Sequence, residues 1–220
     1  MPTFLEILSR QWPRFLEESI EHIQLVLASI AVATVIGVVL AVLTYQHERA
    51  ASIVLAITSG ILTIPSFALF ALLIPLPLVG GLGFRPAWVA LSAYALMPIV
   101  RNTIVGLRGV EADIVESARG MGMSRWRQLL RIEMPLAWPV VIAGIRIATL
   151  LIVSIAAIAA LVGGPGLGNS ILAGLARIGG AGAVPLAVGG TVAIVLVALV
   201  LDLFYLAIAR FTVPAGIRHD

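Results

Sequence analysis

Apolar residues fill five long blocks of this chain, and polar or glycine-rich stretches separate one block from the next. A helix needs about 20 predominantly apolar residues to cross the hydrocarbon core of a bilayer, and each block is long enough. The blocks predict spanning helices at residues 22–45, 53–76, 86–107, 138–162 and 184–209. We therefore expect an all-α integral membrane protein with one transmembrane helix for each block.

The first residues of the chain differ from the blocks. Residues 1–21 mix apolar and charged side chains at roughly helical spacing, which favours an amphipathic helix at the membrane interface. A polar leader that continues directly into the first span fits the pattern equally well. The expected organisation is an N-terminal interfacial segment at 1–21, a transmembrane domain at 22–210 and a cytoplasmic tail at 211–220.

Prolines and one carboxylate inside the blocks are candidate features of a transport pathway. Pro65 and Pro98 lie within the second and third blocks and should kink them, either at a pathway or for packing alone. Asp202 lies within the fifth block, where a carboxylate is costly and is by default a functional candidate. It could attract a cationic solute, or it could pair with an arginine such as Arg146.

The composition supports a membrane protein and excludes several kinds of chemistry. The chain is 60% hydrophobic and 11% charged, whereas soluble domains are about 25% charged. All 14 basic residues are arginines, and there is no cysteine. Without lysine the chain lacks the phosphate-binding residue of a Walker-type loop and the amine of a Schiff-base enzyme. Any nucleotide that energises this protein must therefore be hydrolysed by another polypeptide.

One strongly polar segment, residues 111–135, separates the third block from the fourth. It carries four arginines and four carboxylates: Arg119, Arg125, Arg127, Arg131, Glu111, Asp113, Glu116 and Glu133. Such a segment must lie in water on one face of the membrane. With five spans, ten arginines fall on the side of this segment or at its span ends, and four fall on the other side. The positive-inside rule then places the segment in the cytoplasm and the N-terminus outside.

Within this polar segment the residues predict two short helices around a glycine break. The carboxylates favour the N-terminal end of the first helix, and Gly120 and Gly122 end it. Ser124 can cap the second helix, and Pro135 stops that helix before the fourth span. The second helix carries an apolar stripe made by Trp126, Leu129, Leu130 and Ile132. The result is a compact projection with an apolar face and an arginine rim, which suits docking into a groove of a partner protein.

Glycine is concentrated in residues 163–183, between the fourth and fifth blocks. The pattern predicts an outer turn, a short helix from about Asn169 to Arg177, and a second turn. This stretch is either a periplasmic gate hinged on glycine or an ordinary connector. The candidate gate residues are Gly163, Gly164, Gly166 and Gly168.

The polar segment resembles the EAA loop of ABC importer permeases. That motif reads EAA, three residues, G, nine residues, I-x-L-P. Here Glu116-Ser117-Ala118, Gly122, Ile132, Met134 and Pro135 keep every spacing, with serine in place of one alanine and methionine in place of leucine. Four further segments resemble the osmoprotectant branch of these permeases, which serves glycine betaine, choline and carnitine: residues 63–76, 94–103, 143–149 and 163–168.

The resemblance implies a type I importer in a bacterial or archaeal cytoplasmic membrane. Two permease subunits, identical or different, would pair within the lipid, and each would insert its loop into a cytoplasmic ATPase subunit. ATP and Mg²⁺ would bind the ATPase, with no cofactor on this chain, and a separate extracytoplasmic binding protein would deliver the solute. The resemblance assigns the docking loop to Glu116, Ser117, Ala118, Gly122, Ile132 and Pro135. Arg119, Arg125 and Arg127 could pair with acidic residues of the ATPase or form a solvated rim.

Other functions fit parts of the pattern. A helix-turn-helix reader of DNA is disfavoured because the polar segment is tethered at both ends by spans, so we expect no nucleic acid partner. An ATP-independent channel or carrier, or a permease for another small solute such as an amino acid, stays open. No HExxH or GxSxG motif and no pair of membrane aspartates indicates an intramembrane enzyme, and we expect no metal site.

Overall fold

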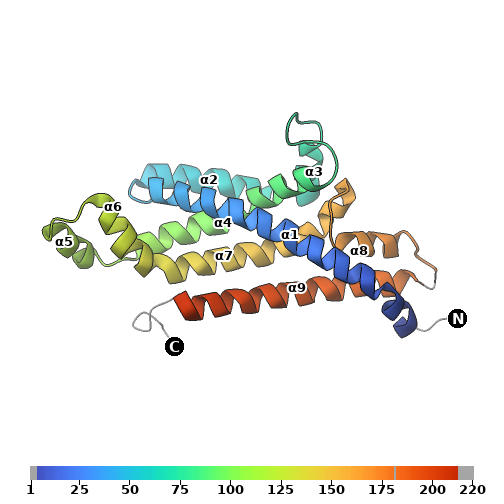
Figure 1. Cartoon of the computed structure of the whole chain (residues 1–220). Helices are drawn as coiled ribbons and strands as arrows, with labels where there is room; N and C mark the ends of the chain where they lie inside the picture. The colour runs from blue at the N-terminus through green and yellow to red at the C-terminus, as the bar shows by residue number, and fades with distance from the viewer. Residues whose placement is uncertain (1–3, 181, 213–220) are drawn as a thin grey trace.

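The computed structural model describes residues 4–180 and 182–212, and every regular element among them is helical (Figure 1). A π-helical turn separates α6 from α7, and a short 3₁₀ helix follows α7. The elements in chain order are α1 (Phe4–Thr44), α2 (Glu48–Thr63), α3 (Ser66–Leu73), α4 (Phe84–Arg108), α5 (Ala112–Gly120), α6 (Arg125–Gln128), the π turn (Leu129–Glu133), α7 (Met134–Ala156), the 3₁₀ helix (Ile158–Val162), α8 (Gly168–Leu175) and α9 (Ala183–Thr212).

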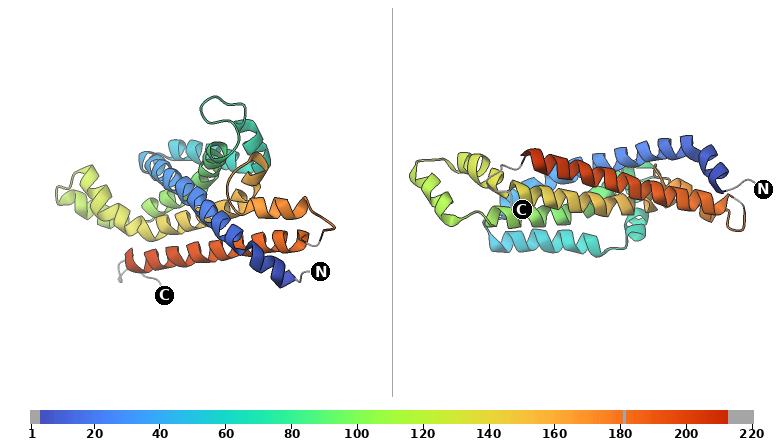
Figure 2. Two further views of the ribbon diagram at one scale, coloured as in Figure 1. Left: turned by 45° about the vertical axis from the view of Figure 1, so that its right-hand side comes forward. Right: turned by 90° about the horizontal axis from the view of Figure 1, so that it is seen from below.

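The long helices lie side by side along one axis. Figures 1 and 2 place α4 and α7 between α2 on one side and α9 on the other, with α1 crossing over them. Four helical stretches among the described residues are long and apolar enough to span a membrane, and a fifth is added if α2 and α3 together form one bent span. The expectation of an all-α membrane bundle is confirmed.

Small residues let the central helices approach closely. A Cβ atom on Gly144 of α7 would lie 2.9 Å from the carbonyl oxygen of Pro98 in α4, and one on Gly37 of α1 would lie 2.9 Å from a methyl of Ile99. In α1, Ser29 and Ala33 are also fully buried. Membrane helices associate through such close packing, because lipid tails supply no hydrophobic driving force between them.

The expected second span is broken at Pro65. The axes of α2 and α3 are bent by 96° at this point, because proline has no N–H to continue the helix and pushes the preceding residue to extended angles. Ile64 accordingly has φ −66° and ψ 128°. Its carbonyl accepts a hydrogen bond of 2.6 Å from the hydroxyl of Tyr94 in α4. Pro98, in contrast, lies inside the continuous helix α4, and a kink there stays a prediction.

The chain ends also differ from the expected boundaries. Helix α1 runs unbroken from Phe4 to Thr44, so the described part of residues 1–21 continues directly into the first span. A position of that segment in the membrane interface stays a prediction. At the other end α9 reaches Thr212, and most of the expected tail at 211–220 lies outside the described residues.

Candidate functional site

The polar segment between α4 and α7 projects from one end of the bundle. Figure 1 shows α5 and α6 beyond the ends of the long helices, opposite the end at which α1 begins, and the end of α9 points the same way as this projection. This placement agrees with an arrangement in which the N-terminus and the projection lie on opposite faces of the membrane. We call this polar segment, residues 111–135, the docking loop.

The turn after α5 is a Schellman motif closed by glycine. Helix α5 ends at Gly120, and Gly122 adopts φ +77°. The Gly122 N–H donates to the Arg119 carbonyl at 3.0 Å, and the Met123 N–H donates to the Ala118 carbonyl at 3.2 Å. This pair of bonds satisfies two carbonyls that a helix end leaves open. The predicted glycine break is confirmed, and the left-handed backbone at Gly122 favours glycine at this position.

The second half of the docking loop departs from two expectations. Ser124 occupies the position before α6 but its side chain makes no capping hydrogen bond. Pro135 does not stop the helix, because residues Arg125–Ala156 form one continuous helical stretch that leads into the fourth span. The π turn explains the continuity: the Met134 N–H donates to the Leu129 carbonyl, five residues earlier. The π turn shifts the hydrogen-bond register just where proline supplies no donor, so the chain stays helical.

The docking loop exposes apolar side chains beside arginines. Trp126 and Leu130 are 65% and 62% exposed, whereas Leu129 is buried against the bundle. The predicted apolar stripe is therefore divided, with one part facing outward and one part anchoring the loop. The outward part is completed by Met121 and Ile114 from the α5 side. Among the residues of the EAA-like motif and its arginines, Ala118 is buried, Ile132 and Arg125 are intermediate, and Glu116, Ser117, Arg119, Gly122, Arg127 and Pro135 are exposed.

A buried carboxylate anchors the docking loop to the bundle. Glu133 is 3% exposed, and it accepts hydrogen bonds from the Tyr45 hydroxyl at 2.5 Å and the Gln128 amide at 3.0 Å. The Arg125 guanidinium also forms an ion pair with it. Sequence reasoning counted Glu133 only as one of four carboxylates in water, because linear spacing gives no sign that Tyr45, 88 residues away, would reach it. Arg125 is thus engaged within its own chain, and a role for it at a partner surface stays a prediction.

The expected partner of Asp202 is present. The Arg146 guanidinium in α7 donates to both Asp202 carboxylate oxygens in α9, at 2.5 and 2.8 Å. One helical turn away, the hydroxyls of Thr149 and Tyr205 lie 3.1 Å apart. The bidentate pair neutralises the carboxylate, so Asp202 is not a free anionic site for a cationic solute. The pair joins α7 to α9, and a role for Asp202 in a pathway stays a prediction.

The glycine-rich stretch after α7 packs tightly against other elements. Helix α8 spans Gly168–Leu175, close to the predicted short helix. A Cβ on Gly168 would lie 2.0 Å from the carbonyl oxygen of Ala157, and Gly163 and Gly166 have φ of +72° and +110°. Glu21 in α1 accepts a hydrogen bond of 3.0 Å from the Gly166 N–H. The glycines therefore permit a close-packed turn that α1 holds in place, and a gating role stays a prediction.

Comparison with known proteins decides the family. Residues 33–213 match the family described as binding-protein-dependent transport system inner membrane component. The chain belongs to this family. It is a multi-pass inner-membrane permease of an ABC importer. The assignment of the docking loop to an EAA loop stays a prediction.

Curated relatives match the permease over most of its length. The osmoprotectant import permease protein OsmW of Salmonella typhimurium is 40% identical over 200 residues, covering 90% of this chain and 91% of the relative. The choline transport system permease protein OpuBB of Bacillus subtilis is 36% identical over 220 residues, covering 100% and 98%. Among solved structures, a chain of the MetNI methionine ABC transporter in an inward-facing conformation has a TM-score of 0.78 at 20% identity, covering 91% and 96%. This last likeness supports the fold.

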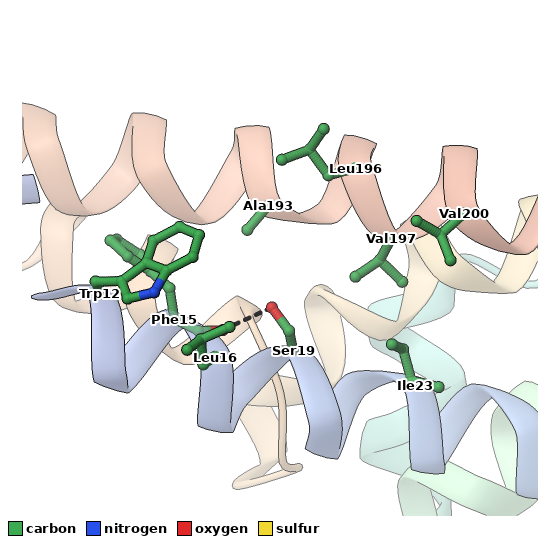
Figure 3. Close-up of a pocket in the computed structure, with 9 residues that line it drawn as sticks. All are labelled: Trp12, Phe15, Leu16, Ser19, Ile23, Ala193, Leu196, Val197 and Val200. Carbon is green, nitrogen blue, oxygen red and sulfur yellow. Dashed lines mark hydrogen bonds between the residues drawn. The ribbon is translucent and has the colours of Figure 1, made fainter. Parts of the chain in front are cut away.

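The permease also carries a small apolar groove between α1 and α9 (Figure 3). Its volume is about 160 Å³. Its polar lining groups are the indole N–H of Trp12 and the Ser19 hydroxyl, which donates to the Phe15 carbonyl at 2.6 Å within the same helix. The other lining side chains are apolar, so this groove has the character of a lipid-facing surface. It is lined by Trp12, Phe15, Leu16, Ser19, Ile23, Ala193, Leu196, Val197 and Val200.

Proposed function

We propose that this permease imports a small quaternary ammonium osmoprotectant, such as glycine betaine, choline or carnitine, and that a separate ATPase drives it through the docking loop. The observation that carries the coupling part of the proposal is the docking loop itself, and the substrate part rests on the curated relatives. It joins the complete spacing of the EAA motif to an exposed apolar face and an arginine rim.

The chemistry of the docking loop favours a protein groove with acidic edges as its partner surface. Trp126, Leu130 and Met121 present large apolar side chains to solvent, and tryptophan is enriched at binding hot spots. Arg119 and Arg127 are exposed beside them and would pair with carboxylates around the groove. ATP and Mg²⁺ would be held by that partner, because this chain has no lysine for a phosphate loop.

The curated relatives support the substrate class, and the side chains of the spans bear on where the solute is recognised. A quaternary ammonium is bound tightly by several aromatic faces that surround it. Phe70 is fully buried in the core and Phe67 is exposed on α3, so these two rings do not face a common site. Asp202 is already paired with Arg146. We therefore assign strong recognition to an extracytoplasmic binding protein and only weak, passing contact to the permease, which would form its pathway with a second permease subunit.

Reconstitution tests this proposal. The permease is co-expressed with candidate ATPase and binding-protein subunits from the same genome, and the complex is placed in proteoliposomes. Uptake of radiolabelled glycine betaine, choline, carnitine and methionine is then measured. We expect uptake of at least one quaternary amine that requires both ATP and the binding protein. Uptake by the permease alone would instead establish a channel or carrier. ATP-dependent uptake of methionine without any quaternary amine would overturn the substrate assignment.

A further inference from the structure

We propose that Glu133 is a positioning residue that fixes the docking loop to the cytoplasmic end of α1, so that movement imposed on the loop is passed to α1 as well as to α7. This inference rests on the proposed coupling function of the loop. It assigns a role to a residue that lies between Ile132 and Met134 of the EAA-like pattern, at a position for which the pattern specifies no residue.

The first support is the number of elements that meet at one carboxylate. Glu133 is the last residue of the π turn, Tyr45 directly follows α1, and Arg125 and Gln128 are the two ends of α6. All three partners donate to the same buried group. Hydrogen bonds to a charged carboxylate are shorter and stronger than neutral ones, so this cluster is the principal polar connection between the loop and the bundle.

Tyr45 extends the connection to α4. Its side chain is 7% exposed, and its backbone carbonyl accepts a hydrogen bond of 2.8 Å from the Arg108 guanidinium in the last turn of α4. The Arg125 guanidinium lies 5.6 Å from the centre of the Tyr45 ring, within the range of a cation–π contact. One tyrosine therefore touches groups from α4, α6 and the π turn at the point where α1 ends.

The rest of the loop has little other support. A surface hollow of about 460 Å³ separates α5 from the bundle, and its walls include Tyr45, Glu116 and Glu133. Helix α5 packs on α6, so its position depends on how α6 is held. The π turn that follows α6 interrupts the regular α-helical bonding, and such turns occur often at functional sites. The contacts of the Glu133 carboxylate with Tyr45 and Arg125 hold this turn. Without the charge of Glu133, the loop could bend at the π turn without moving α1.

The first experiment tests the anchor on the permease alone. The natural absence of cysteine allows a single spin label at Met121→Cys, which is 70% exposed, in lipid nanodiscs. We expect Glu133→Gln to narrow the lines of the label's electron paramagnetic resonance spectrum, because the loop becomes more mobile. Tyr45→Phe should narrow them less. The matched control Glu48→Gln removes an exposed carboxylate from the same end of the bundle and should change nothing. A second label at Val195→Cys on α9 reports any general loosening.

The second experiment tests the consequence in the assembled transporter. We expect Glu133→Gln to retain the ATPase and its hydrolysis but to lower solute uptake per ATP by about 2- to 30-fold, the range of measured coupling effects. Unchanged label mobility at Met121→Cys, or mobility raised equally at Val195→Cys, would overturn the anchor. Increased loop mobility with wild-type uptake per ATP would overturn its role in coupling. Failure of the wild-type complex to show ATP-dependent uptake would refute the proposed function instead, and the label result would still decide the anchor.

Discussion

Substitution of Gly122 gives the sharpest test of the docking loop. We expect Gly122→Asp to reduce transport strongly while membrane insertion stays normal. The residue lies at the turn between α5 and α6, where φ is +77°. No atom lies within 4 Å of where a Cβ would be built, so any effect must come from backbone strain or from the new charge and not from a clash.

The magnitude follows from the left-handed conformation. An L-residue in this region costs about 1–2 kcal/mol, and the two hydrogen bonds of the turn together contribute about 1–3 kcal/mol at roughly 0.5–1.5 kcal/mol each. Strain of this size lowers the population of the correct turn by a factor of about 5 to 30. Aspartate tolerates the left-handed region better than alanine, but it adds a negative charge beside Arg119.

The assay separates these causes with matched variants. ATP-dependent uptake and co-purification of the ATPase are measured at equal permease levels for Gly122→Asp, Gly122→Ala and Gly122→Asn. Alanine reports strain without charge, and asparagine reports a residue that accepts the left-handed region. Gly120→Ala is the control, because Gly120 ends α5 at an ordinary negative φ and a Cβ there also meets nothing.

Two results would refute this reasoning. Normal uptake by both Gly122→Ala and Gly122→Asp would show that the turn geometry is not needed for coupling. Equal loss in Gly120→Ala would show that the loop is sensitive to any side chain and that the left-handed angle is not the cause.

Two further predictions concern the membrane-embedded part. Asp202→Asn should lower the melting temperature of the detergent-solubilised permease in a fluorescence-detected assay, because Arg146 then loses its bidentate partner. The double variant with Arg146→Gln should recover part of this loss, and no recovery would argue against the pair. Glu21→Gln should speed amide hydrogen exchange at Gly166, because the Gly166 N–H donates to the Glu21 carboxylate. Glu17→Gln, at an exposed neighbouring position, should not change it. Equal exchange in the wild type and both variants would show that Glu21 does not hold the glycine-rich turn.

Much of the fold could be predicted from the sequence because membrane spans depend on long-range composition. Apolar length alone identified the bundle, and the cost of a carboxylate in lipid pointed to Arg146 as a partner of Asp202. Pro65 was expected to bend its span, and the bend is 96°. At the break the Tyr94 hydroxyl, from another helix, donates to the Ile64 carbonyl. Such tertiary support is not visible in the local sequence.

The docking loop was predicted less completely, for two physical reasons. Pro135 was expected to end a helix by the usual rule, yet the π turn before it shifts the hydrogen-bond register to positions that do not need the missing N–H. Glu133 was expected in water with the other charges, yet Tyr45 and Arg125 make burial favourable for it. Both departures arise from a register shift and from contacts with α1, and neither is encoded in the spacing of nearby residues.

The unbroken helix that passes through Pro135 has a mechanical consequence. Residues Arg125–Ala156 form 32 helical residues, which at about 1.5 Å per residue make a rod of roughly 48 Å, longer than the hydrocarbon core of about 30 Å. If one end of a rod of this length turns by about 5°, the other end moves by roughly 4 Å. The length of this helix would therefore convert a small rotation at the docking loop into a displacement of several ångströms at the opposite end of the bundle.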